Sequence, residues 1–129
     1  MKLLLDTHAL LWFAAGDPRL SPAARAAIAA PEHDVMVSTV SLWEAAIKVR
    51  TARLSADIPA LTTGCLRAGF RLLDLSALHV GRLMRLAPPG ENRDPFDHLL
   101  LAQAACEGAH FVTADVTLGQ YGEPLLACR

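Results

Sequence analysis

The chain has 129 residues, 53% of them hydrophobic, and a formal net charge of −1, which suits one domain spanning residues 1–129 and excludes a strongly basic or acidic protein. Charged residues interrupt every apolar stretch well before the roughly 18 residues that a membrane-spanning helix needs, and Asp6 breaks the apolar start, which argues against a secretory signal. We therefore expect a soluble protein with no membrane contact. The three cysteines have neither disulfide nor zinc spacing, so we expect them to be buried free thiols in a reducing cytoplasm.

The first predicted elements are a strand and two helices. Lys2–Leu5 lacks polar alternation, which predicts a strand buried on both faces. His8–Ala15 is expected to form a helix closed by Gly16, since glycine favours the left-handed conformation at a helix C-terminus. Ser21 precedes a proline and is the expected N-cap of an alanine-rich helix that runs to Ala30.

The rest of the chain continues to alternate short apolar strands with helices. The expected elements are a strand at Val35–Ser38, helices from Ser41 to Val49 and from Ile58 to Gly69, a strand at Arg71–Leu75, helices from Ser76 to Leu86 and from Asp94 to Gly108, and strands at His110–Thr113 and Leu125–Ala127. Such alternation predicts an α/β fold with a central, mostly parallel sheet of four to five strands.

Four acidic residues fall at related points of this layout. Asp6 directly follows the first strand, and Asp115 comes two residues after the strand that ends at Thr113. Glu44 and Asp97 lie in the first turns of predicted helices. Because ligands bind at the carboxyl ends of the strands in parallel α/β sheets, these side chains are expected to meet there. Clustered carboxylates need a cation to stay ionised, and Mg²⁺ prefers oxygen ligands.

Two of these acids also have structural explanations at helix starts. Ser41 and Glu44 have the spacing of a capping box, and Glu44 could pair with Lys48 one turn later. Asp94 and Asp97 stand at the N-cap and third positions of their helix, where acids favour the helix dipole. Taken singly, each of these residues is compatible with a purely structural role.

The remaining two acids differ from each other in this respect. Asp115 has an ordinary explanation as a turn residue. Asp6 stands between two apolar segments, and no lysine or arginine lies near it in the sequence. A carboxylate in such surroundings is costly without a partner, so a metal ion is the simplest partner for Asp6.

Four blocks of sequence resemble the PIN-domain proteins, in particular the ribonuclease toxins of VapBC toxin–antitoxin pairs. The blocks occur in matching order and cover essentially the whole chain: Leu3–Trp12 (LLLDTHALLW), Val37–Lys48 (VSTVSLWEAAIK), Asp94–Ala104 (DPFDHLLLAQA) and Phe111–Asp115 (FVTAD). The resemblance implies a PIN-like α/β/α sandwich and Mg²⁺- or Mn²⁺-dependent cleavage of RNA to 5′-phosphate and 3′-hydroxyl ends. It also implies a homodimer and a VapB-like antitoxin that occludes the site.

The same resemblance implies roles for individual residues. The family's metal ligands correspond to Asp6, Glu44, Asp97 and Asp115. Asp94 is expected to cap its helix beside the ligands, and Thr113 to hold a metal-bound water. The chain departs from its relatives at His98, where they commonly carry arginine, which leaves a surface or substrate contact open.

The RNA contacts and the alternative functions follow from the remaining residues. The candidates for contact with the RNA backbone, which could equally be solvated helix faces, are Lys48, Arg50 and Arg53, together with Arg82, Arg85 and Arg93.

A haloacid-dehalogenase-like phosphotransferase with Asp6 as nucleophile is one alternative, although position 8 would then be expected to hold an acid rather than His8. A catalytically inactive RNA- or protein-binding module is the other alternative.

Overall fold

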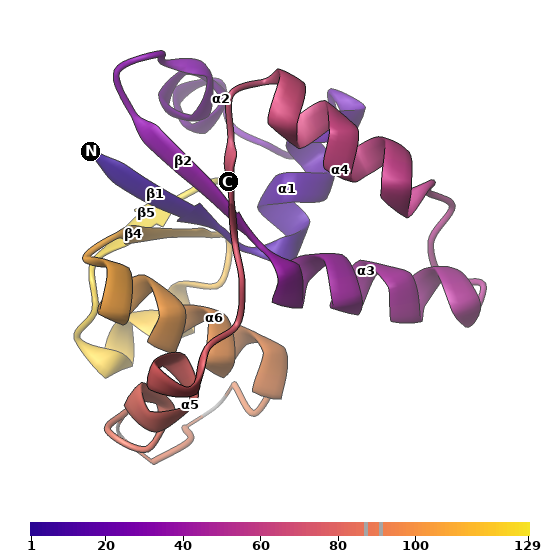
Figure 1. Cartoon of the computed structure of the whole chain (residues 1–129). Coiled ribbons are helices and arrows are strands. Elements are labelled where there is room, and N and C mark those ends of the chain that lie inside the picture. Colours follow the sequence, from indigo (N-terminus) through magenta and orange to yellow (C-terminus); the bar gives the residue numbers. More distant parts are fainter. Residues whose placement is uncertain (87, 91) are drawn as a thin grey trace.

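A five-stranded parallel sheet forms the centre of the protein (Figure 1). The computed structural model describes residues 1–86, 88–90 and 92–129. The strands are β1 (Lys2–Leu5), β2 (Asp34–Ser38), β3 (Arg71–Leu73), β4 (His110–Thr113) and β5 (Leu125–Ala127). They lie in the order β3-β2-β1-β4-β5, and every neighbouring pair is parallel. This arrangement confirms the predicted parallel sheet.

Strand β1 lies at the middle of the sheet and is covered on both faces. Its three leucines are fully buried. Leu3 and Leu5 belong to one apolar core, whereas Leu4 belongs to the other, because successive side chains of a strand point to opposite faces. Full burial on both faces explains why this strand has no polar alternation.

Helices cover both faces of the sheet (Figure 1). The helices are α1 (Thr7–Ala15), α2 (Pro22–Ala29), α3 (Thr39–Arg50), α4 (Ile58–Arg67), α5 (Ala77–Leu83), α6 (Pro95–Glu107) and a 3₁₀ helix at Val116–Tyr121. Residues of α1, α2 and α4 pack into one core, and residues of α6 pack into the other. The result is the α/β/α sandwich that the family resemblance implies, and none of the described helices is long and apolar enough to cross a membrane.

Several predicted helix ends are confirmed. Gly16 and Gly108 adopt the left-handed conformation at the ends of α1 and α6, with φ of 63° and 65°. The hydroxyl of Ser21 accepts from the Ala24 N–H, and the carboxylate of Asp94 accepts from the Phe96 N–H. Local sequence signals therefore set these boundaries, as capping chemistry requires.

Other predicted boundaries are wrong by a few residues. Helix α3 begins at Thr39 and not at Ser41, because β2 leads straight into it and the Ser38 hydroxyl accepts from the Val40 N–H at 3.0 Å. Ser41 therefore does not cap a helix. Strand β3 ends at Leu73, α5 ends at Leu83, and the 3₁₀ helix was not predicted.

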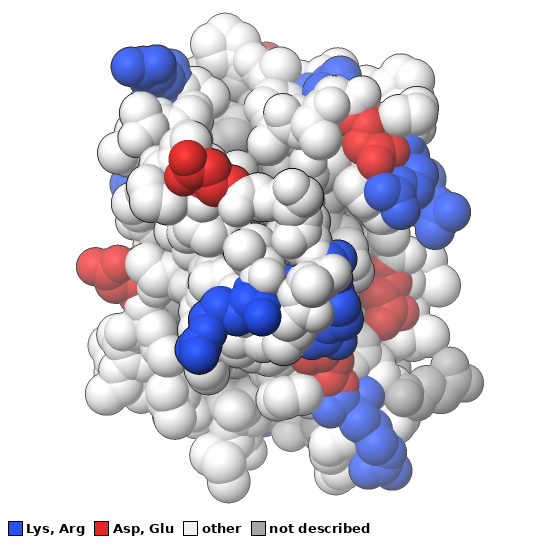
Figure 2. Space-filling view, turned by 90° about the vertical axis from the view of Figure 1, so that its right-hand side faces the viewer, with Lys and Arg blue, Asp and Glu red and all other residues white. Residues whose placement is uncertain are grey.

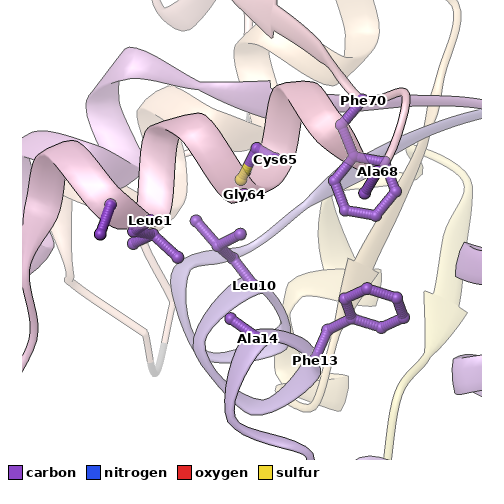
Figure 3. A pocket seen from close by; sticks show the side chains of 9 residues that line it. Leu10, Phe13, Ala14, Leu61, Gly64, Cys65, Ala68 and Phe70 are labelled. Atoms are coloured by element: carbon purple, nitrogen blue, oxygen red, sulfur yellow. The ribbon is translucent and has the colours of Figure 1, made fainter.

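An apolar cavity of about 410 Å³ lies between α1 and α4 (Figure 3). Phe13 and Phe70 pack at one end of it with ring centroids 5.5 Å apart. Its lining consists of Leu10, Phe13, Ala14, Ala60, Leu61, Gly64, Cys65, Ala68 and Phe70. The lining carries no charged side chain, and its one ionisable group is the buried thiol of Cys65.

The cysteines divide into two buried thiols and one exposed thiol. The prediction of buried free thiols is confirmed for Cys65 and Cys128 and is wrong for Cys106, which is exposed. Burial raises the pKa of Cys65, and it raises the pKa of Cys128 to about 11 with a smaller contribution from the charge of Asp6. Both buried thiols are therefore protonated and unreactive at neutral pH.

Candidate active site

An acidic pocket of about 420 Å³ opens at the carboxyl ends of the central strands. It lies where the strand order reverses: the chain builds β2 and β3 on one side of β1, and then β4 and β5 on the other. Such a switch point is the usual ligand site of an open α/β sheet. The acids that line it are Asp6, Glu44, Asp94, Asp97 and Asp115. The structure thus brings all four predicted ligands to one pocket.

Asp6 is nearly buried and has two hydrogen-bond donors. The Ala9 N–H donates to its Oδ1 at 2.7 Å, so Asp6 is also the N-cap of α1, a role that the sequence analysis did not assign. The Thr113 hydroxyl donates to its Oδ2 at 2.6 Å. Burial raises the pKa of Asp6 despite these hydrogen bonds, which favour the ionised form.

Glu44 projects from the second turn of α3 and is 8% exposed. The capping-box explanation is wrong, because Ser38 and not Ser41 caps this helix. The hydroxyl of Thr7 donates to Glu44 Oε1 at 2.6 Å, and Lys48 Nζ lies 3.5 Å from Oε2. The predicted pair with Lys48 is therefore present, and the two contacts fix the carboxylate at the pocket.

Asp97 stands at the third position of α6, and Asp94 caps the same helix as predicted. Burial raises the pKa of Asp97 to about 6, with further contributions from the charges of Asp94, Asp6 and Glu44. A hydrogen bond from Asn92 acts in the opposite direction. The other carboxylates are thus close enough to disfavour ionisation of Asp97.

Asn92 is a pocket neighbour that the sequence analysis missed. Its side-chain Nδ2 donates to Asp97 Oδ2 at 2.8 Å and to Asp115 Oδ2 at 2.6 Å. Its Oδ1 accepts from the Asp94 N–H at 2.7 Å. An asparagine two residues before a helix cap is a signal for a local turn, but nothing in the sequence indicates its contact with Asp115.

Asp115 caps the 3₁₀ helix that follows β4. Its Oδ1 accepts from the hydroxyl of Thr117 at 2.6 Å, and this bond is the main reason why the pKa of Asp115 is lowered. The Thr113 hydroxyl accepts from the Asp115 N–H at 3.1 Å while donating to Asp6. Thr113 therefore links the two strand-end acids, and its hydroxyl hydrogen is directed at Asp6.

The rim of the pocket is cationic around a tryptophan. The guanidinium carbons of Arg19 and Arg129 lie 5.1 and 5.9 Å from the centroid of the Trp12 ring, and His8 stacks on that ring at 5.7 Å. All four residues line the pocket. Asp17 holds Arg19 by an ion pair of 2.7 Å. The pocket thus has an acidic floor and a rim that can meet a phosphate.

The predicted RNA contacts lie in different places. Lys48 is paired with Glu44, whereas Arg50 and Arg53 do not line the acidic pocket. Arg53 follows α3 and donates to the Thr51 hydroxyl at 3.0 Å. Figure 2 shows lysine and arginine side chains beside acidic ones on one face of the molecule rather than in a patch of one sign.

The comparisons with known proteins agree with this geometry. The model of the PIN domain family matches residues 3–124. The chain belongs to the PIN domain family. The resemblance inferred from the four sequence blocks is thereby confirmed, and the match does not favour the phosphotransferase alternative. No curated protein sequence matches this PIN domain.

Solved structures share the fold of this PIN domain at low sequence identity. VapBC2 of Rickettsia felis, bound to a DNA fragment from its promoter, has a TM-score of 0.72 at 16% identity, with all of both chains covered. DNA-bound VapBC of Salmonella typhimurium has a TM-score of 0.67 at 16% identity, with 98% of each chain covered. VapC20 of Mycobacterium tuberculosis, a toxin that cleaves the sarcin–ricin loop, has a TM-score of 0.66 at 22% identity, with 96% of this chain and 98% of that chain covered.

The donor set of this PIN domain suits a hard divalent cation. Across residues 1–86, 88–90 and 92–129, no three His, Cys, Asp or Glu side chains lie close enough to form a preassembled metal site. Mg²⁺ does not require one, since it usually binds one or two carboxylates and keeps several waters. Burial and neighbouring carboxylates raise the pKa values of Asp6 and Asp97, which means that their ionised forms are disfavoured. A bound cation would stabilise these ionised forms. The residues therefore fit Mg²⁺ or Mn²⁺.

Proposed function

We propose that this PIN domain is a Mg²⁺- or Mn²⁺-dependent endoribonuclease and acts as the toxin of a toxin–antitoxin pair. The observation that carries the proposal is the convergence of Asp6, Glu44, Asp97 and Asp115 on one pocket at the switch point of the sheet. The similarity to VapC20, a toxin that cleaves the sarcin–ricin loop, supports RNA as the substrate class. The pocket's acids make metal-assisted hydrolysis the chemistry that suits it.

Each side chain of the pocket has a proposed part in this reaction. Asp6 and Asp97 would hold the cation, while Glu44 and Asp115 would complete its surroundings, orient waters or accept a proton. When bound, the cation supplies Lewis-acid polarisation of the scissile phosphate and activates water for attack. Hydroxyl donors fix the carboxylates beforehand, with Thr113 on Asp6 and Thr7 on Glu44. Such fixed dipoles need no reorganisation during the reaction.

The cationic rim would hold the RNA backbone beside the acids. Guanidinium groups bind phosphate oxygens in a planar, two-point geometry. Arg19 and Arg129 border the same pocket as the acids, and Asp17 fixes the orientation of Arg19. Lys48, Arg50 and Arg53 remain candidates for contacts with RNA further along the strand.

The proposed partners are a VapB-like antitoxin that occludes the pocket and a second copy of the chain, both in the cytoplasm. Relatives of the same fold occur as VapBC complexes bound to DNA. Large apolar side chains are exposed at Leu78 and Val80 of helix α5 and at its C-cap Met84, and a protein partner would cover them.

Cleavage of total RNA by the purified protein tests the proposal. We expect cleavage with Mg²⁺ or Mn²⁺ and none with EDTA. Asp6→Asn should reduce the rate at least about a hundredfold, because even the residues that support metal ligands cost 10–100-fold when they are changed. Asp57→Asn is the matched control, since Asp57 caps α4 through the same contact that Asp6 makes in α1 but does not line the pocket.

Two results would contradict the proposal. One is cleavage by clean protein that persists in EDTA. The other is cleavage by Asp6→Asn at the rate of the Asp57→Asn control, which would show that the strand-end carboxylate has only the capping role.

A further inference from the structure

Asn92 places one amide nitrogen between two carboxylates of the acidic pocket. Nδ2 lies 2.8 Å from Asp97 Oδ2 and 2.6 Å from Asp115 Oδ2, so each of its hydrogens has an acceptor. The orientation of the amide is fixed, because Oδ1 accepts from the Asp94 N–H at 2.7 Å. A flipped amide would turn its oxygen toward two carboxylates and its NH₂ group toward another donor, and would lose all three bonds.

The backbone of Asn92 is anchored as firmly as its side chain. His98 Nε2 lies 2.8 Å from the Asn92 carbonyl oxygen, and it meets the Tyr121 hydroxyl at 3.2 Å. His98 can donate a hydrogen bond to the Asn92 carbonyl only when its Nε2 carries a hydrogen. His98 thus holds the backbone of Asn92 in place.

The amide binds two of the carboxylates assigned to the cation: Asp97, which would hold it, and Asp115, which would complete its surroundings. Its two hydrogens carry partial positive charge and face the two carboxylate oxygens. A cation that binds both oxygens would compete with the amide for the same space and the same lone pairs.

We propose that Asn92 is a positioning residue that holds Asp97 and Asp115 together in the metal-free protein and gives way to the divalent cation. The inference rests on the proposed function in one respect, that the cation belongs to this pocket. The metal-free protein is stabilised by two hydrogen bonds to charged groups. The cation must replace both of them, so Asn92 weakens the apparent affinity of the site.

Binding of Mg²⁺ and Mn²⁺ without RNA tests this inference. Affinity is measured by calorimetry, and the melting temperature is followed during the same titrations. Asn92→Ala should melt at a lower temperature than the wild type without metal and bind the cation at least about tenfold more tightly, because the cation no longer has to replace two hydrogen bonds to charged groups. Asn92→Asp, nearly identical in shape, is the second variant and should also bind the cation more tightly.

Thr117→Val is the matched control. It removes a 2.6 Å hydrogen bond to the same carboxylate of Asp115, but from a donor that does not reach Asp97. This variant should also melt at a lower temperature, but its affinity for the cation should be unchanged or weaker. A merely structural role for Asn92 would make Asn92→Ala behave like Thr117→Val.

The outcomes separate this inference from the proposed function. Tighter binding by Asn92→Ala supports the inference, including the case in which only the variants bind. Equal or weaker binding by Asn92→Ala, with binding by the wild type, overturns the inference and leaves the metal-dependent function intact, even if Asn92→Asp binds more tightly, because its added carboxylate is itself a ligand. If neither the wild type nor the variants bind either cation, the inference and the metal dependence fail together.

Discussion

Two cavities of nearly equal volume, about 410 and 420 Å³, share helix α1 and have opposite chemistry. Leu10 and Phe13 of α1 line the apolar cavity, whereas Asp6 at its N-cap and Trp12 line the acidic pocket. Volume therefore says nothing about which one is the site of chemistry. Only the acidic pocket carries carboxylates with raised pKa values at the switch point of the sheet.

The largest expected effect is a loss of stability on substitution at the apolar cavity, with no effect on the acidic pocket. Phe70 is almost fully buried and lines the apolar cavity. Phe70→Ala should lower the free energy of unfolding by about 3–5 kcal/mol, as large-to-small core substitutions do. Denaturant unfolding measures this loss, and the rise in melting temperature on adding Mg²⁺ should match that of the wild type. If the response to Mg²⁺ were lost as well, the two cavities would not be independent.

A smaller effect, confined to the acidic pocket, depends on pH. Because the pKa of Asp97 is raised from 3.8 to about 6, the folded protein keeps this proton to a higher pH than the unfolded chain does. The contribution of this proton to the free energy of unfolding is fully present below pH 3.8 and is lost as the pH rises through about 6. In EDTA the loss should be about 2 kcal/mol, since a unit of pKa corresponds to about 1.4 kcal/mol and the group is partly screened by solvent.

Asp97→Asn removes this contribution, because it replaces the titrating carboxyl with a neutral amide and leaves the other acids of the pocket in place. In EDTA, the unfolding free energy of the wild type should fall relative to that of Asp97→Asn as the pH rises from 3.8 to about 6. Parallel pH profiles for the two proteins would contradict the raised pKa of Asp97.

The smallest expected effect is a gain at the apolar cavity. Gly64 lies inside α4, and a Cβ added there meets nothing within 4 Å. Gly64→Ala should raise the free energy of unfolding by about 0.5–1 kcal/mol, because glycine is unfavourable inside a helix. Thermal unfolding measures this gain, and RNA cleavage should stay at the wild-type rate. A loss of stability would mean that this part of α4 tolerates no added side chain.

The sequence predicted the strands and most helix ends because their signals are local. Lys2–Leu5 and His110–Thr113 match the observed strands, and the glycines at positions 16 and 108 end their helices as expected. The start of α3 was missed because Ser38 and Ser41 both suit an N-cap, and the end of β2 decides between them. The local capping signal is ambiguous at such positions.

The four acids of the candidate site and the pair of Glu44 with Lys48 could be predicted from the sequence, but the long-range partners of the acids could not. Asp6 and the Thr113 hydroxyl that holds it are 107 positions apart. Asn92 reaches Asp115 across 23 positions, and no periodicity or motif connects them. Contacts of this kind depend on tertiary packing. The same is true of the cavity between α1 and α4, which the sequence analysis did not foresee.

Anomalous scattering from Mn²⁺ in crystals of the wild type tests the shared cation site most directly. We expect a peak in the acidic pocket within about 2.5 Å of carboxylate oxygens of Asp6 and Asp97, a distance typical of oxygen ligands. The peak should vanish in Asp6→Asn. A peak at another place, or full occupancy in Asp6→Asn, would contradict the account.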